Sequence, residues 1–148
     1  MERTRLAPTV GIVACVVLLV ALVVPYLLVR TPGIVATYYG TSLINPLFAG
    51  LFAVVALLGF AAGREERTDP VVAAAVSLVF GAFGLLICVL WVASDPGVII
   101  FNLDLSPESG AGESSLVRSL EYHPYVVALV ALVVPVSAGW YARELGLL

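Results

Sequence analysis

Residues 63–70 read Gly-Arg-Glu-Glu-Arg-Thr-Asp-Pro and form the only short, densely charged segment of the chain. An apolar run flanks this turn on each side, and both runs are too long for a strand in a soluble core. Moving Arg64 and Arg67 across a bilayer is costly, so the turn is expected to stay on the cytoplasmic side of a membrane. Its position then determines the direction of every other segment.

The composition indicates that the chain lies in a membrane. Hydrophobic residues make up 61% of the 148 residues and charged residues only 11%, whereas soluble domains average about 25% charged residues. At this length we expect a single domain, residues 1–148. The formal net charge is −3 and lysine is absent, so the chain has no basic surface for nucleic acid. An acidic, lysine-free composition is typical of salt-loving microbes.

Four spanning helices are predicted at about residues 6–29, 43–63, 70–94 and 124–143. About 20 apolar residues, each rising 1.5 Å, cross a hydrocarbon core of roughly 30 Å. A cleaved signal peptide is the alternative for the first run. That run exceeds the usual apolar region of a signal peptide, and no clear Ala-x-Ala site follows it. Ser42 or Asn45, with Pro46, marks the start of the second helix; Asp69-Pro70 and His123-Pro124 mark the third and fourth.

Two loops, residues 30–42 and 95–123, are expected on the outer side. Ile34–Tyr39 is rich in β-branched and aromatic residues, which is typical of extended chain. Residues 101–105 alternate between apolar and polar side chains, which indicates a strand. We therefore expect that the two loops can pair as a small β-ribbon. Ser106–Ser115 is a flexible linker by composition.

The arginines predict the orientation. Five lie beside the helix ends on the side of the charged turn and two on the other side, and the richer side is cytoplasmic. The chain is thus predicted to be a multi-pass protein of the cell membrane with both termini in the cytoplasm. Aromatic residues are expected to form belts at the two membrane boundaries. The outer belt comprises Tyr26, Tyr38, Tyr39, Trp91, Tyr122 and Tyr125, and the inner belt comprises Trp140 and Tyr141.

Small residues line one track on each predicted helix, and such tracks let helix backbones approach in lipid. We expect these tracks to pack within the chain, with oligomerisation as the alternative. They contain Ala7, Gly11 and Cys15; Gly59 and Gly63; Ala73, Ser77 and Gly81; and Ala128, Ala131 and Ser137 to Gly139.

Leu-Val-Ala-Leu-Val-Val-Pro occurs at residues 19–25 and again at 129–135. An inverted repeat of a transporter would show such a pair, but the copies share only the commonest residues of these helices, so coincidence is the simpler explanation. Pro25 and Pro135 are expected to kink their helices.

No ionisable residue is expected at membrane depth, which argues against an ion-coupled carrier. Ser77 and Ser137 are the polar side chains there, and such serines often bond to a carbonyl one turn earlier. Cys15 and Cys88 lie in apolar runs and are expected to pack as small apolar residues. Enzyme signatures are missing, so no catalytic, cofactor-binding or metal-ligating residue is predicted.

Acidic residues gather in the second outer loop. With the only histidine they could hold a divalent cation, although their spacing matches no ligand pattern, and a solvated acidic face explains them as well. His123 itself can be a pH sensor or simply a helix-start residue. The loop residues are Asp95, Asp104, Glu108, Glu113, Glu121 and His123.

Several short stretches together resemble a family of small four-helix membrane proteins from halophilic archaea. They are residues 7–11 (Ala-Pro-Thr-Val-Gly), 36–40 (Ala-Thr-Tyr-Tyr-Gly), 63–70, 120–123 (Leu-Glu-Tyr-His) and 140–143 (Trp-Tyr-Ala-Arg). The resemblance covers nearly the whole chain. It implies a fold and a host but transfers no site residue.

Two functions are consistent with these features. The first is a non-enzymatic structural or accessory protein whose partners are the lipid bilayer and another membrane protein. That partner would bind the outer loop 95–123 or the small-residue helix faces. The alternative is a small transporter or a carrier of a lipid or small molecule, built around Pro25 and Pro135. The alternative predicts a polar cavity between the first and fourth spanning helices.

Overall fold

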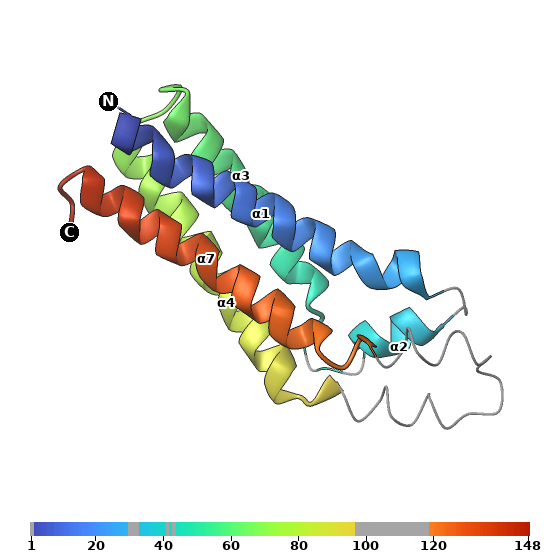
Figure 1. Ribbon diagram of the computed structural model, residues 1–148. Coiled ribbons are helices and arrows are strands. Elements are labelled where there is room, and N and C mark those ends of the chain that lie inside the picture. The colour runs from blue at the N-terminus through green and yellow to red at the C-terminus, as the bar shows by residue number, and fades with distance from the viewer. Residues whose placement is uncertain (1, 30–32, 41, 43, 97–118) are drawn as a thin grey trace.

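A computed structural model describes residues 2–29, 33–40, 42, 44–96 and 119–148, which form five helices (Figure 1). Four of these helices, all except α2, are long and apolar enough to cross a membrane. The predicted four-helix membrane fold is confirmed to this extent. The helices are α1 (Glu2–Leu28), α2 (Ile34–Gly40), α3 (Leu47–Arg64), α4 (Pro70–Ala93) and α7 (His123–Glu144).

The helix starts follow local capping chemistry. Asp69 is the N-cap of α4 and accepts a hydrogen bond from the Val71 N–H at 2.8 Å, as its place before Pro70 predicts. At the start of α3 the Asn45 Oδ1 accepts from the Leu47 N–H at 2.9 Å. This helix therefore begins four residues later than the sequence indicates, while α1 begins four residues earlier, at Glu2.

The four long helices form a ring in which each packs against two neighbours. α1 packs against α3 and α7, and α4 packs against the same two helices. Consecutive helices in the ring run antiparallel, so both termini and the α3–α4 turn lie at one end of the bundle (Figure 1). The short helix α2 lies at the other end (Figure 1).

Glycines bring the helices into close contact. A Cβ on Gly11 would lie 2.4 Å from the Phe60 ring, and one on Gly81 would lie 2.9 Å from the Val134 side chain. Gly59 and Gly63 meet α4 in the same way, since Cβ atoms there would lie 2.6 and 2.7 Å from α4 side-chain atoms. The small-residue tracks of α1, α3 and α4 therefore pack within the chain, as predicted, whereas Gly139 of the α7 track meets no neighbouring atom within 4 Å.

The two buried serines use different partners. Ser137 donates to the Val134 carbonyl at 2.8 Å, one turn earlier in α7, as expected. Ser77 instead donates across the helix pair, to the Ala56 carbonyl of α3 at 3.2 Å. The expectation of a bond within its own helix is wrong for Ser77, because α3 presents a carbonyl where Gly59 lets the two backbones approach.

The predicted β-ribbon is not supported. Residues 34–40 form a helix instead of an extended segment, and no strand occurs among the residues that the structure describes. The helix places Val35, Tyr38 and Tyr39 on one buried face at i, i+3 and i+4. Burial of this face outweighs the β-propensity of the individual residues. The strand predicted at residues 101–105 and the linker Ser106–Ser115 lie outside the described residues.

Helix α3 ends in a Schellman motif. The Arg67 N–H donates to the Ala62 carbonyl at 2.9 Å and the Glu66 N–H donates to the Gly63 carbonyl at 3.3 Å. This motif needs a left-handed residue, and Glu66 supplies it with a φ of 57°. A left-handed conformation costs a non-glycine residue about 1–2 kcal/mol.

Helix α7 ends in the same motif with the usual residue. The Leu147 N–H donates to the Ala142 carbonyl and the Gly146 N–H donates to the Arg143 carbonyl, both at 3.0 Å. Gly146 takes the left-handed position with a φ of 72°. The C-terminal ends of α3 and α7 therefore share one backbone geometry, with Glu66 at the left-handed position of the first and Gly146 at that of the second.

We expect Glu66→Gly to raise the free energy of unfolding by about 0.5–1 kcal/mol, because glycine removes the left-handed strain. The lost ion pair with Arg5, 3.5 Å long and largely exposed, offsets less than about 1 kcal/mol. Thermal unfolding in detergent measures the difference, and Gly146→Ala is the opposite control, expected to destabilise. A clear loss of stability in Glu66→Gly would show that the ion pair outweighs the strain.

Candidate functional site

A cluster of aromatic and polar side chains lies at the α2 end of the bundle. Tyr38 and Tyr39 of α2 and Trp91 of α4 are each 1% exposed, and His123 of α7 is 9% exposed. The Trp91 ring meets the Tyr38 ring edge-on at 78°, with ring centroids 5.3 Å apart. Together with the end of α1, four of the described helices meet here. We call these four residues the outer cluster, because they lie at the end of the bundle that the sequence predicts to be on the outer side.

A proline in α1 creates the main polar contact of the outer cluster. Pro25 has no backbone N–H, so it cannot donate to the carbonyl of Ala21 four residues earlier. The His123 Nε2 lies 2.7 Å from that carbonyl oxygen. Because a carbonyl only accepts, Nε2 must carry a proton. The imidazole thus replaces the helical hydrogen bond that Pro25 removes.

The other imidazole nitrogen joins α7 to α2. His123 Nδ1 lies 3.0 Å from the Tyr38 hydroxyl. In the neutral imidazole with Nε2 protonated, Nδ1 accepts and the hydroxyl donates. The Tyr38 hydroxyl also lies 3.3 Å from the Leu120 carbonyl, a second and longer acceptor. His123 therefore connects three helices through hydrogen bonds at both nitrogens of its ring.

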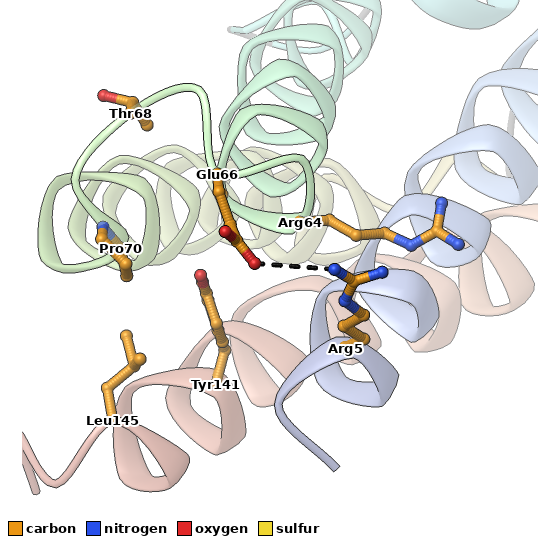
Figure 2. A pocket seen from close by; sticks show the side chains of 8 residues that line it. Arg5, Arg64, Glu66, Thr68, Pro70, Tyr141 and Leu145 are labelled. Atoms are coloured by element: carbon orange, nitrogen blue, oxygen red, sulfur yellow. Dashed lines mark ion pairs between the residues drawn. The ribbon is translucent and has the colours of Figure 1, made fainter. Parts of the chain in front are cut away.

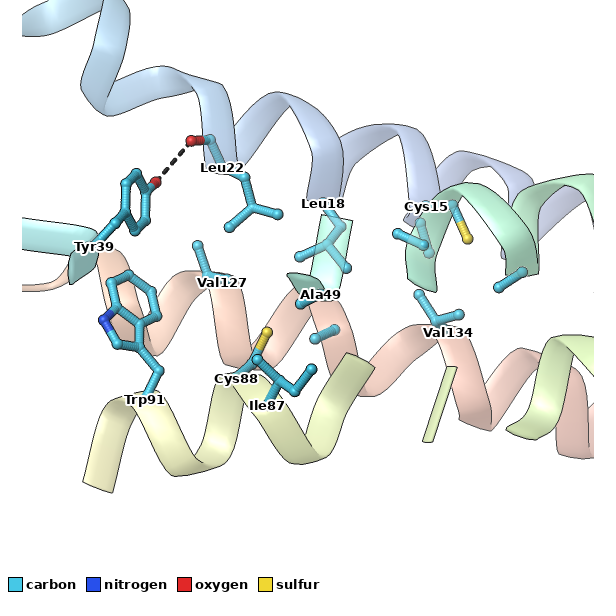
Figure 3. Packing of buried hydrophobic residues seen from close by; sticks show 14 of the residues in the cluster. Cys15, Leu18, Leu22, Tyr39, Ala49, Ile87, Cys88, Trp91, Val127 and Val134 are labelled. Atoms are coloured by element: carbon cyan, nitrogen blue, oxygen red, sulfur yellow. Dashed lines mark hydrogen bonds between the residues drawn. The ribbon is translucent and has the colours of Figure 1, made fainter. Parts of the chain in front are cut away.

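Tyr39 fastens α2 directly to α1. Its hydroxyl donates to the Leu22 carbonyl at 2.7 Å (Figure 3), and its ring stacks on Tyr26 at a centroid distance of 5.8 Å. Trp91 lies beside it in the same cluster, and its indole nitrogen has no hydrogen-bond partner among the described residues. Apolar side chains continue the core beyond the cluster, including Leu18, Leu22, Ile87, Val127 and Val134 (Figure 3).

Burial sets the protonation of the two tyrosines. It raises the pKa of Tyr38 and of Tyr39 above the ordinary value of 10, because the charged form loses its hydration. The unfolded chain releases these protons first as the pH rises, so stability is present below about pH 10 and is lost above it. We expect Tyr39→Phe to reduce the slope of the free energy of unfolding against pH in this alkaline range by the contribution of about one proton. Unfolding followed by circular dichroism between pH 8 and 12 measures it, and an unchanged slope would contradict the burial of Tyr39.

The outer aromatic belt is only partly as predicted. Tyr26, Tyr122 and Tyr125 are exposed, whereas Tyr38, Tyr39 and Trp91 lie in the core. At the inner boundary Trp140 is exposed and Tyr141 is buried. The belt prediction is wrong for the four buried residues, because they fill space between helices. Two features of the sequence indicate a buried contact at this end of the bundle. Pro25 leaves a carbonyl that needs another donor, and Tyr38 and Tyr39 are adjacent aromatic residues with hydroxyl groups.

The acidic loop residues do not gather around His123 in the part that is described. Asp95 and Glu121 are exposed, and the described residues contain no group of three metal-ligating side chains. Asp104, Glu108 and Glu113 lie outside the described residues. Cys15 and Cys88 are both free and fully buried, consistent with their predicted packing role. His123 does start a helix, but its ring is a structural link rather than an exposed group.

Comparison with known proteins gives one match. A model of DUF7548, described as a family of unknown function, matches residues 1–146. The chain belongs to this family. Neither the curated proteins nor the solved structures contain a match. The match covers nearly the whole chain, as the resemblance implied, and membership of DUF7548 assigns no activity to the outer cluster.

Proposed function

We propose that the chain is a non-enzymatic accessory protein of the cell membrane that binds another membrane protein through residues 95–123. The outer cluster carries this proposal. Trp91 lies near the end of α4 and His123 starts α7, so the cluster fastens the helix turns on both sides of this polar segment to α1 and α2. A recognition segment held at both ends loses less conformational freedom on binding.

The proposed orientation places both termini in the cytoplasm. Figure 1 shows both termini and the α3–α4 turn at one end of the bundle. In the sequence, Arg3, Arg5, Arg64, Arg67 and Arg143 belong to that end. The arginine excess supports a cytoplasmic location for it. The acidic, lysine-free composition supports a halophilic archaeal host.

Labelling of engineered cysteines tests this orientation. Cys15 and Cys88 are fully buried, so they add little background. A membrane-impermeant maleimide applied to intact cells is expected to react with Gly110→Cys and not with Glu65→Cys. Reaction of Glu65→Cys in intact cells would reverse the proposed orientation.

The interface between α1 and α7 does not support a carrier of a polar solute. A groove of about 340 Å³ lies on this interface, lined by Thr9, Ala14 and five valines. The carrier predicts a polar cavity there, and the described residues supply one hydroxyl, which already donates to the Arg5 carbonyl at 2.6 Å. An apolar groove of this kind suits lipid chains rather than a polar solute.

The accessory function is tested by purifying the tagged chain from its native membranes in mild detergent. Quantitative mass spectrometry then identifies the proteins that come with it. The test variant replaces Asp104, Glu108 and Glu113 by the corresponding amides. The matched control removes three charges from the opposite end of the bundle, at Glu2, Glu65 and Glu144.

We expect the outer variant to lose a protein partner that the wild type and the control retain, because acidic groups fix register and speed encounter at interfaces. Retention of every partner by the outer variant would contradict binding through residues 95–123. Loss of the partner from the control alone would place the interface at the other end of the bundle.

A further inference from the structure

A pocket opens at the end of the bundle that holds both termini. Its volume is about 460 Å³, and it lies between the start of α1, the α3–α4 turn and the end of α7 (Figure 2). This pocket, the inner pocket, is far from the outer cluster, at the opposite end of the helices. Its charged and hydroxyl-bearing lining residues are Arg5, Arg64, Glu66, Thr68 and Tyr141.

The charge of the inner pocket is positive. Arg5 and Arg64 bring two guanidinium groups, and Glu66 brings the one carboxylate of its lining. Glu66 lies 3.5 Å from Arg5, whereas Arg64 has no acidic partner within ion-pair distance among the described residues. Guanidinium groups bind phosphate oxygens through paired hydrogen bonds. The pocket can therefore accept an oxyanion at the position that the Glu66 carboxylate now approaches.

Two hydroxyls add neutral donors. Thr68 and Tyr141 line the pocket, and neither hydroxyl has a hydrogen-bond partner in the part of the chain that the structure describes. Tyr141 is only 3% exposed, so packing holds its ring while its hydroxyl points toward Glu66 (Figure 2). A Cβ added to Gly63 would lie 2.8 Å from this hydroxyl. The hydroxyl of Tyr141 in α7 thus lies against Gly63 of α3 and faces the pocket that it lines.

The position of the pocket at the ends of the apolar spans favours a lipid over a free ion. The apolar spans begin at Arg5 in α1 and at Pro70 in α4, and the α3 span ends at Arg64. The pocket therefore lies at the boundary between apolar and polar surface, where lipid phosphates lie. Leu145 and Pro70 add an apolar wall, which suits the glycerol and first methylene groups of a lipid.

We propose that the inner pocket binds the phosphate of an anionic phospholipid, held by the guanidinium groups of Arg5 and Arg64 and by the hydroxyl of Tyr141, with Thr68 at the edge of the pocket (Figure 2). Glu66 competes with the lipid phosphate for Arg5. The left-handed backbone of Glu66, with its φ of 57°, holds this residue in the turn beside the pocket. This site is independent of the accessory function, so either proposal can fail without the other.

Native mass spectrometry of the delipidated full chain tests the site by titration with phosphatidylglycerol. Loss of one arginine is expected to weaken binding about fivefold and Arg5→Gln with Arg64→Gln about 25-fold, following the usual contribution of a basic residue near a membrane surface. Glu66→Gln is expected to tighten binding about fivefold, because it removes the competing charge. This gain of affinity cannot come from a misfolded variant.

Arg143→Gln is the matched control, since Arg143 is exposed at the same end but does not line the inner pocket. It is expected to bind as the wild type does. Equal binding of phosphatidylcholine, or full competition by inorganic phosphate at the lipid concentration, would overturn the assignment to an anionic lipid. Wild-type affinity in the double arginine variant, or weaker binding in Glu66→Gln, would overturn the site itself.

Discussion

His123→Ala is expected to lower the free energy of unfolding by about 2–4 kcal/mol, because it removes a hydrogen-bond partner from two groups that pack between helices and leaves the Tyr38 hydroxyl only its longer contact to the Leu120 carbonyl. The first is the Ala21 carbonyl, which Pro25 deprives of a helical donor and which His123 Nε2 meets at 2.7 Å. The second is the Tyr38 hydroxyl, which lies 3.0 Å from Nδ1. Unfolding in mixed micelles, followed by circular dichroism, measures the loss.

A double-mutant cycle with Pro25 identifies the cause. Pro25→Ala restores a backbone N–H that can donate to the Ala21 carbonyl, as in an ordinary helix. In that background His123→Ala is expected to cost about 1–2 kcal/mol less than it does beside Pro25. The difference isolates the contact between the imidazole and α1 from the packing of the ring.

His123→Gln completes the comparison, since its amide offers both a donor and an acceptor. It is expected to recover part of the stability that His123→Ala loses. Equal costs of His123→Ala with and without Pro25 would show that His123 contributes packing alone. The inference that His123 replaces the helical hydrogen bond removed by Pro25 would then be wrong.

Gly11→Ala is expected to lower the free energy of unfolding by about 3 kcal/mol, the upper part of the range for overpacked cores. An added Cβ would lie 2.4–2.6 Å from three atoms of the Phe60 ring. Phe60 is fully buried, so its ring has no free space to enter. Thermal unfolding in detergent and separation by size exclusion measure the loss of the folded monomer.

Gly139→Ala is the matched control, because a Cβ there meets no atom within 4 Å. It is expected to be neutral, or stabilising by less than about 1 kcal/mol through the helix propensity of alanine. Phe60→Leu added to Gly11→Ala makes room and is expected to restore part of the stability. Similar effects of Gly11→Ala and Gly139→Ala would contradict the close contact of α1 with α3.

Local chemistry predicts the start of α4 correctly. Asp69 and Pro70 place a cap and a first-turn proline side by side, and α4 begins as this pair predicts. Pro124 likewise lies in the first turn of α7, which begins at His123 without a side-chain cap. By contrast, the extended segment predicted at residues 34–39 is wrong. The helix α2 forms there because Tyr38 and Tyr39 are buried against α1, α4 and α7, whose residues lie far away in the sequence. The inner pocket was likewise hidden, since Arg5, Glu66 and Tyr141 meet only in the folded bundle.

The sequence by itself determined that four apolar segments of spanning length are separated by polar turns, because run length, charge and capping residues are local properties. It also determined that small residues would let these segments pack. Only the tertiary structure decided that His123 satisfies the carbonyl freed by Pro25, and that two arginines and two hydroxyls border one pocket. Such contacts join residues up to 136 positions apart, from Arg5 to Tyr141, and a local pattern carries no information about which of many possible partners the fold selects.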